Sequence, residues 1–322
     1  MINTSSAQCP RATVSIDQVL ELFTRRLSFQ PLIAAQTFCP RLRFYDRLWT
    51  PLITLWSVVW QRLQLDPTLD AVVKDARRGG ADALTPGERP LSQRLRSRAS
   101  TALSNARRRL PLRWLRHVFT RLTTLLRAQA PGLNWHDLRV GLLDGSTVRL
   151  RPHGNIPKRF TPAVNQHGQT YWCLVRVVVA FCAGSGLALA TGLGPVSVSE
   201  QTLAVSLILR GVAGMVWVGD RNFGLWRIAR AAVQAQSQVL VRLTETRARR
   251  LLGRSLSAGL DQAVCWTPSR ADQIDPGLEA LAVEGRLLAL LIRRAGLREQ
   301  WLYLFTTLTD PVRYPAEELL AL

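Results

Sequence analysis

The order of the hydrophobic segments between residues 138 and 243 places the strongest constraint on what this chain can fold into. Residues 138–150, "LRVGLLDGSTVRL", are typical of a strand, and residues 171–183 and 187–193 predict a hairpin that turns at Gly184-Ser185-Gly186. A helix, a short buried strand, a second helix and a further strand are predicted next, at 197–212, 215–219, 223–236 and 238–243. Three antiparallel strands followed by alternating helix and strand predict an α/β fold with a mixed sheet.

This order of elements is that of a ribonuclease-H-like core, in which the first and fourth strands lie side by side. Each of these two strands carries an aspartate at or near its end, followed by a turn: Asp144 in "LLDGST" and Asp220 in "VGDRNFG". Only one other carboxylate, Glu200, lies between residues 138 and 244. We therefore expect Asp144 and Asp220 to converge on one spot, although they are far apart in the sequence.

Two converging carboxylates repel one another unless they share a proton or a cation. Oxygen ligands favour Mg²⁺ or Mn²⁺ over zinc, and a pair of such ions supports phosphoryl transfer. The run before Asp220, "GMVWVG", predicts a buried strand, and a buried carboxylate is costly unless something compensates it. A metal ion would compensate it, so Asp144 and Asp220 are both candidate catalytic and metal-binding residues.

Each carboxylate also has a structural interpretation. Asp220 could form an ion pair with Arg221, although neighbouring residues of a strand point to opposite faces. Asp144 could be a plain turn residue. Glu200 is predicted to close a capping box with Ser197 at the start of its helix rather than to bind a metal.

The charge of the chain points to a polyanionic partner, and double-stranded DNA is the leading candidate. The sequence has 42 basic and 22 acidic residues, a net charge of +20. Its first part predicts helices in "VLELFTRRLSF" and "LRWLRHVFTRLTTLLRAQA", with a break rich in Gly and Pro at 77–90. From Arg94 to Arg127 there are ten arginines and no carboxylate, interleaved with Trp114 and Phe119. We expect phosphate contacts from Arg94, Arg96, Arg98, Arg107, Arg108, Arg109, Arg113, Arg116 and Arg221.

The same sequence argues against secretion and against a membrane span. The N-terminal segment has no apolar core of a signal peptide, and the uncharged segment at 48–60 is short and contains Pro51. The uncharged segment at 177–199 predicts the hairpin described above. The five cysteines lack C-x-x-C spacing, and the four histidines lack metal-ligand spacing. We expect a cytoplasmic protein without membrane contact.

Three blocks of the sequence resemble bacterial insertion-sequence transposases of the IS-four group. They are "LLDGSTVRL", "VWVGDRNFGLW" and "LFTTLTDPVRYPAEELLAL". That family carries an Asp-Asp-Glu triad on a ribonuclease-H-like core, and its two aspartates map onto Asp144 and Asp220. The resemblance covers roughly residues 134–322.

The resemblance implies a nucleoid-associated transposase that cuts DNA at element ends and joins it to target DNA. It implies Mg²⁺ or Mn²⁺ as cofactor and a homodimer as a possible assembly. It divides the chain into an arginine-rich DNA-binding region at 1–133 and a catalytic core at 134–322, with an insertion at about 246–300 that the basic, loop-rich segment at 246–285 fits. In the family the third block continues into a helix that bears the glutamate, with the pattern Tyr-x-x-Arg-x-x-x-Glu-x-x-x-x-x-x-Lys. That glutamate would lie beyond Leu322, so we expect a C-terminally truncated chain that is inactive alone.

Two other functions stay open on the sequence. Asp144, Glu200 and Asp220 could together form the site of a ribonuclease-H-like nuclease. The chain could also be a non-catalytic DNA-binding fragment that inhibits a full-length transposase.

Overall fold

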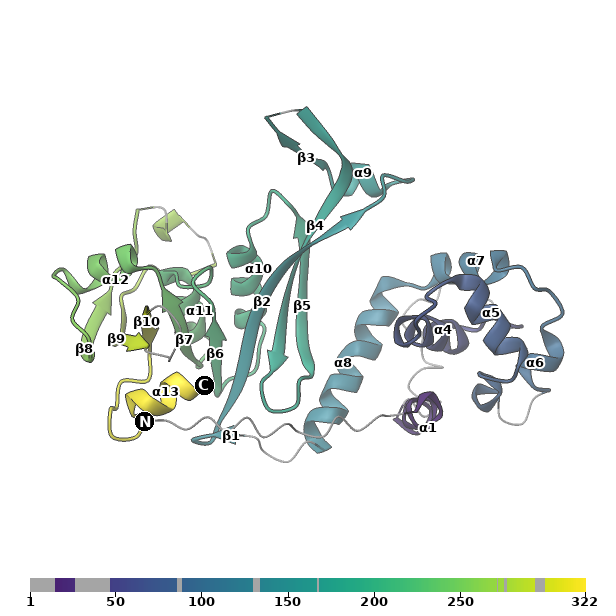
Figure 1. The fold of residues 1–322 in the computed structure, drawn as a ribbon, viewed down its shortest axis with the longest axis horizontal. Helices are drawn as coiled ribbons and strands as arrows, with labels where there is room; N and C mark the ends of the chain where they lie inside the picture. The colour runs from purple at the N-terminus through teal and green to yellow at the C-terminus, as the bar shows by residue number, and fades with distance from the viewer. Residues whose placement is uncertain are drawn as a thin grey trace. The chain divides into compact units, whose positions relative to one another are not determined.

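Figure 1 shows the computed structural model of the chain. The structure describes residues 15–26, 47–85, 89–129, 134–166, 168–270, 272–274, 277–292 and 299–322. The chain divides into two compact units, Met1–Gln129 and Ala130–Leu322. The first is helical in its described part, and the second contains the sheet that carries the two candidate aspartates.

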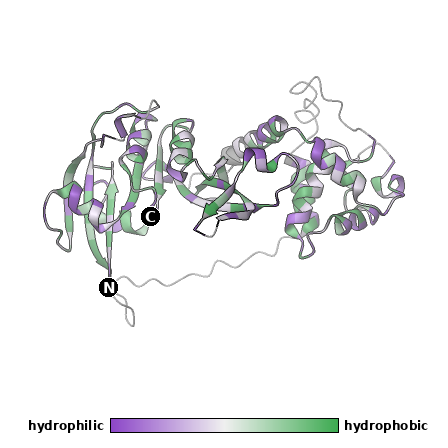
Figure 2. Cartoon of the chain, turned by 90° about the horizontal axis from the view of Figure 1, so that it is seen from above, coloured by the Kyte–Doolittle hydropathy of each residue, from purple (hydrophilic) through white to green (hydrophobic). Residues whose placement is uncertain are grey.

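Amphipathic helices build the first unit, and their apolar faces bury large aromatic side chains. Trp49, Trp56 and Trp60 belong to one core, and Trp114 belongs to a second, smaller one. In Figure 2 these helices carry both hydrophilic and hydrophobic colours, as amphipathic helices do. The described α-helices of this unit are α1 (Ile16–Arg26), α4 (Pro51–Leu63), α5 (Leu69–Arg77), α6 (Leu91–Arg94), α7 (Thr101–Arg109) and α8 (Leu112–Gln129).

One mixed sheet of ten strands forms the framework of the second unit. The strands lie in the order β3-β4-β2-β6-β7-β10-β9-β8, with β1 paired to β2 and β5 paired to β4. Their bounds are β1 Asn134–Trp135, β2 Leu138–Leu150, β3 Pro162–Asn165, β4 Gly168–Cys182, β5 Ala188–Pro195, β6 Met215–Gly219, β7 Gln238–Leu243, β8 Leu260–Trp266, β9 Val283–Ile292 and β10 Gln300–Thr306.

Five of these strands give the sheet its ribonuclease-H-like order. β2, β4 and β5 form an antiparallel meander, and β6 then returns parallel to β2, with β7 parallel to β6. The spatial order is therefore β5-β4-β2-β6-β7, in which the first and fourth strands of the core are neighbours. This confirms the predicted fold class, and the strands predicted at 138–150, 215–219 and 238–243 have the bounds that the sequence pattern indicated.

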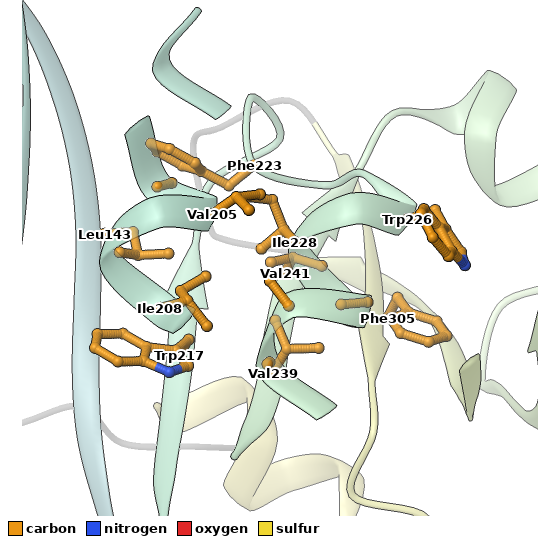
Figure 3. Close-up of a cluster of buried hydrophobic side chains, with 14 of the residues drawn as sticks. Leu143, Val205, Ile208, Trp217, Phe223, Trp226, Ile228, Val239, Val241 and Phe305 are labelled. Atoms are coloured by element: carbon orange, nitrogen blue, oxygen red, sulfur yellow. The ribbon is translucent and has the colours of Figure 1, made fainter. Parts of the chain in front are cut away.

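Helices cover both faces of the sheet. On one face α10 (Glu200–Leu209) and α11 (Trp226–Gln234) pack together, and the core beneath them includes the labelled side chains of Figure 3. Leu143 and Trp217 reach this core from the adjacent strands β2 and β6. On the other face α13 (Ala316–Ala321) buries Leu319 with Val216, which lies on β6. Consecutive residues of β6 therefore alternate between the two cores.

The segment after β7 contains more regular structure than the sequence indicated. Residues 246–285 were expected to be loop-rich, whereas the structure has helix α12 (Glu245–Leu252) and strand β8 there. β8 pairs with β9, β9 with β10, and β10 with β7, so these strands extend the sheet of the core. The prediction failed because β8 lies at the edge of the sheet without a fully buried residue, and its apolar run is limited to the four residues 263–266.

Two helix starts differ from the prediction. The helix at 197–212 begins at Glu200, and its cap is Ser199, whose hydroxyl accepts from the Thr202 N–H at 3.1 Å. The predicted capping box of Ser197 with Glu200 is therefore wrong, because the cap lies two residues later. The helix at 223–236 begins only at Trp226, since residues 220–223 form a turn closed by the Phe223 N–H on the Asp220 carbonyl at 3.0 Å.

A buried arginine joins the outer strands to the segment that leads into α13. Arg286 on β9 is 3% exposed and forms an ion pair with Asp261 on β8. Its other amino group donates to the carbonyls of Leu308 and Tyr314, at 3.2 and 2.8 Å. A single guanidinium therefore holds together β8, β9 and the loop after β10.

We predict that Arg286→Met lowers the free energy of unfolding by about 3 kcal/mol, because it leaves a carboxylate and two carbonyls without their donor. Urea denaturation measures this. Arg270→Met, at an exposed arginine shortly after β8, is the control and should change stability by less than about 0.5 kcal/mol. Equal effects of the two substitutions would contradict this role of Arg286.

Candidate active site

The pairing of β2 with β6 brings the two aspartates together. The last registered pair of these parallel strands is Leu143 with Gly219, so Asp144 and Asp220 are the next residues on adjacent chains. Neighbouring strands lie about 4.8 Å apart. Both side chains are exposed, at the level where β6 stops and β2 continues with β4 as its paired neighbour. The predicted convergence therefore follows from strand order and register.

The two aspartates also share a face of the sheet. Residues directly opposite one another on paired strands point the same way, and alternate residues share a face. Val216 and Val218 lie in the core beneath α13, and Asp220 continues their alternation. In β2, Leu143 faces the opposite core beneath α10, so Asp144 faces the α13 side.

The argument from burial for a metal at Asp220 is wrong. The side chain is exposed, because β6 ends at Gly219 and Asp220 begins the turn that follows. None of the ion pairs between described residues joins Asp220 to Arg221, which also disfavours the structural alternative. A local turn orients Asp220 instead: its Oδ1 accepts from the Asn222 N–H at 2.9 Å.

Glu200 lies on the other face of β2, across Gly145. A Cβ at Gly145 would come within 2.5 Å of Glu200 Oε2 and 2.6 Å of its Cδ, so this carboxylate lies directly over the glycine. Because Asp144 and Gly145 are consecutive residues of a strand, they point to opposite faces. Glu200 and Asp144 therefore lie on opposite sides of the sheet at this level.

Asn222 connects Glu200 to the turn that carries Asp220. Its Nδ2 donates to Glu200 Oε2 at 2.5 Å, and Gln201 Nε2 donates to the Asn222 Oδ1 and carbonyl at 2.6 and 3.0 Å. Two residues at the start of α10 therefore hold the turn after β6 in place through hydrogen bonds. Asn222 and Gln201 were not predicted from the sequence, although "DRN" after a strand is a signal for an Asx turn.

The donor set at the aspartates fits one hard cation. Mg²⁺ is commonly bound by one or two carboxylates together with substrate phosphates and water. Asp144 and Asp220, exposed and on one face, match that description. Within the described residues no group of three or more His, Cys, Asp or Glu side chains is arranged to hold a metal ion, so Asp144, Glu200 and Asp220, the residues of the alternative nuclease site, do not form such a group.

The arginines expected to contact DNA lie mainly on the first unit. Arg96, Arg98, Arg108, Arg109, Arg113 and Arg116 are exposed, and Arg94 and Arg107 are half-buried. Trp114, expected to be interleaved with them at the surface, is 1% exposed and belongs to the core. Arg221 is exposed in the turn after Asp220, and its carbonyl accepts from Arg247 Nη1 at 2.9 Å.

None of the described histidines belongs to a group of three or more His, Cys, Asp or Glu side chains that could hold a metal ion. His136 contacts Glu318 at 2.5 Å and packs edge-on against Trp135 and Tyr314. His167 lies outside the described residues. Among the helices that the structure describes, none is both long and apolar enough to cross a membrane.

Comparison with known proteins gives similarities to solved structures, whereas no protein-family model and no curated protein matches the chain. Among solved structures, the chain is similar to the piggyBac transposase in its synaptic complex with hairpin DNA, with 13% sequence identity and a TM-score of 0.38. The alignment covers 92% of this chain and 64% of that one, so the chain spans less than two thirds of that transposase. The fold class of this chain rests on its own strand order and register.

We predict that the effects of Gly145→Ala and Glu200→Ala on the free energy of unfolding are not additive. In the natural chain the added methyl group must displace the Glu200 carboxylate, and Gly145→Ala should destabilise by about 1 kcal/mol. In a Glu200→Ala background the same change should stabilise by about 0.5 kcal/mol, because glycine is unfavourable inside a strand. Urea denaturation of the four proteins measures the difference. Additive effects would contradict the placement of Glu200 over Gly145.

Proposed function

We propose that the chain is a transposase of the Asp-Asp-Glu type, from a bacterial insertion sequence, with Asp144 and Asp220 as metal-binding catalytic residues. The observation that carries this proposal is the position of the two aspartates in register and on one face, where the parallel pairing of β2 with β6 ends in a ribonuclease-H-like sheet. The three sequence blocks described above support the same family.

The chemistry proposed is the cleavage and joining of DNA phosphodiester bonds. A bound Mg²⁺ or Mn²⁺ would activate the attacking oxygen and stabilise charge on the phosphate that is transferred. The role of the chain is to hold the two carboxylates in place: the β2–β6 register sets their spacing, and the Asx turn at Asn222 orients Asp220. The open end of the sheet leaves room for a DNA backbone at the exposed carboxylates.

The proposal also assigns a part in DNA binding or DNA chemistry to each region of the chain. Residues 1–133 would bind the element ends through their exposed arginines, and residues 134–322 would carry the chemistry. A homodimer would bring two element ends together. The excess of basic over acidic residues, 42 against 22, supports a DNA partner.

The metal site can be tested without DNA cleavage. Fe²⁺ with ascorbate and peroxide generates radicals at a bound metal and cuts the protein backbone nearby. We expect cuts close to residues 144 and 220 that excess Mg²⁺ suppresses. Asp144→Asn and Asp220→Asn should each reduce cutting by about tenfold or more, a loss of about 1.4 kcal/mol of binding.

Glu200→Gln is the matched control, since it removes a charge but keeps an oxygen that accepts from Asn222. It should preserve cutting within about twofold. Loss of cutting in Glu200→Gln as well would favour the ribonuclease-H-like nuclease with three carboxylates. Cutting that is unchanged by both aspartate substitutions would exclude the proposed metal site and leave a non-catalytic DNA-binding protein.

A further inference from the structure

The outer parts of β2 and β4 form a ribbon that extends beyond the body of the sheet. We call residues 146–166 and 168–174 the outer ribbon: the end of β2, helix α9 (Ile156–Arg159), strand β3 and the start of β4. β5 pairs with β4 only as far as Val175, so the outer part of β4 has β2 and β3 as its neighbours. In Figure 1 β3, α9 and the outer end of β4 lie beyond the ends of β5 and α10.

The outer ribbon carries positive charge without compensation. Arg149, Arg151, Lys158 and Arg159 are all exposed. The sequence has no Asp or Glu from residue 145 to residue 199, and none of the ion pairs between described residues includes these four side chains. Solvated surfaces usually mix both signs of charge, so an exposed surface with basic side chains alone indicates an anionic partner.

Apolar side chains are exposed beside these charges. Tyr171 is 67% exposed and Trp172 37%, with their rings edge-to-face at 5.3 Å, and Val164 on the facing strand β3 is 77% exposed. Arg159 lies over the Phe160 ring at 5.6 Å. Exposed aromatic rings interleaved with basic side chains are suited to a partner that offers both phosphates and apolar sugar or base surface.

The shape of the ribbon selects among anionic partners. A narrow β-ribbon is one of the two elements that the major groove of B-DNA admits. The β3–β4 hairpin has this form, since Val164 pairs with Gln169 and Asn165 with Gly168 across a short turn. We propose that the outer ribbon binds duplex DNA, with Arg149, Arg151, Lys158 and Arg159 at phosphates and Tyr171 and Trp172 against the groove.

The position of the ribbon relates this contact to the aspartates. Arg151 follows Asp144 by seven residues along the direction of β2, about 23 Å at 3.3 Å per residue. That length corresponds to about seven base pairs at 3.4 Å each. If the proposed function holds, the ribbon contacts the DNA duplex about one half of a helical turn or more away from the phosphate that lies at Asp144. Binding of DNA by the ribbon does not itself require that the aspartates catalyse cleavage.

The salt dependence of DNA binding by the full chain tests the proposal. Fluorescence anisotropy with a labelled duplex, from about 50 to about 200 mM salt, gives the affinity and the slope of its logarithm against log salt. Changing the four basic side chains of the ribbon to Gln should weaken binding by at least about tenfold at physiological salt. It should also reduce the slope by about 2 to 3.5, because each lost phosphate contact contributes about 0.9.

Two matched variants make the result specific to the ribbon. The control variant changes to Gln four exposed arginines elsewhere on the second unit: Arg139, Arg210, Arg270 and Arg313. It should leave the slope of log affinity against log salt within about 0.5 of the natural value. A second variant, in which Arg149, Arg151 and Arg159 become Lys, keeps the charge and should retain the natural slope. Circular dichroism verifies that each variant is folded.

Each outcome decides between the proposals. A natural chain that binds DNA, with no difference between the ribbon variant and the control, would overturn the ribbon proposal and leave the proposed function standing. A natural chain that does not bind duplex DNA would overturn both. An equal loss in both Gln variants would mean a general effect of charge and would also overturn the ribbon proposal.

Discussion

The parallel register between β2 and β6 is the constraint on which the candidate site depends. The pairs Arg139–Met215 through Leu143–Gly219 align the two strands so that an aspartate is the next residue on each. A shift of one residue would turn one of the two carboxylates to the opposite face, because the side-chain period of a strand is two. The register therefore determines both the spacing of the aspartates and the face that they share.

Packing on the α10 side holds this register. A Cβ at Gly141 would come within 2.7 Å of the Trp217 ring, so the absence of a side chain on β2 makes room for the tryptophan of β6. Trp217 and Leu143 then lie in one core with residues of α10 and α11 (Figure 3). In the same way, the absence of a side chain at Gly145 makes room for the carboxylate of Glu200. Two glycines on one face of β2 thus admit large or charged neighbours, while the other face at Asp144 stays open to solvent.

Strand order, and with it the adjacency of Asp144 and Asp220, could be predicted from the sequence, because the alternation of apolar residues is a local signal. Contacts between segments could not. The hydrogen bonds of Gln201 and Glu200 with Asn222 join residues more than twenty positions apart in the sequence. These residues meet because α10 packs against the sheet. The exposure of Asp220 was also missed: the end of the strand at Gly219 was predicted correctly, but the apolar run before Asp220 indicated that the aspartate itself is buried. β8 was not predicted because this edge strand has one exposed face and an apolar run of only four residues, 263–266.

Diffraction from crystals soaked in Mn²⁺, recorded at a wavelength where manganese scatters anomalously, tests the central claim most directly. The account predicts one strong anomalous peak on the α13 side of the sheet, about 2.1 Å from a carboxylate oxygen of Asp144 and of Asp220. Glu200 would remain over Gly145 on the other side, bonded to Asn222. A peak held by Glu200 and only one aspartate, or two aspartates that point away from one another, would contradict it.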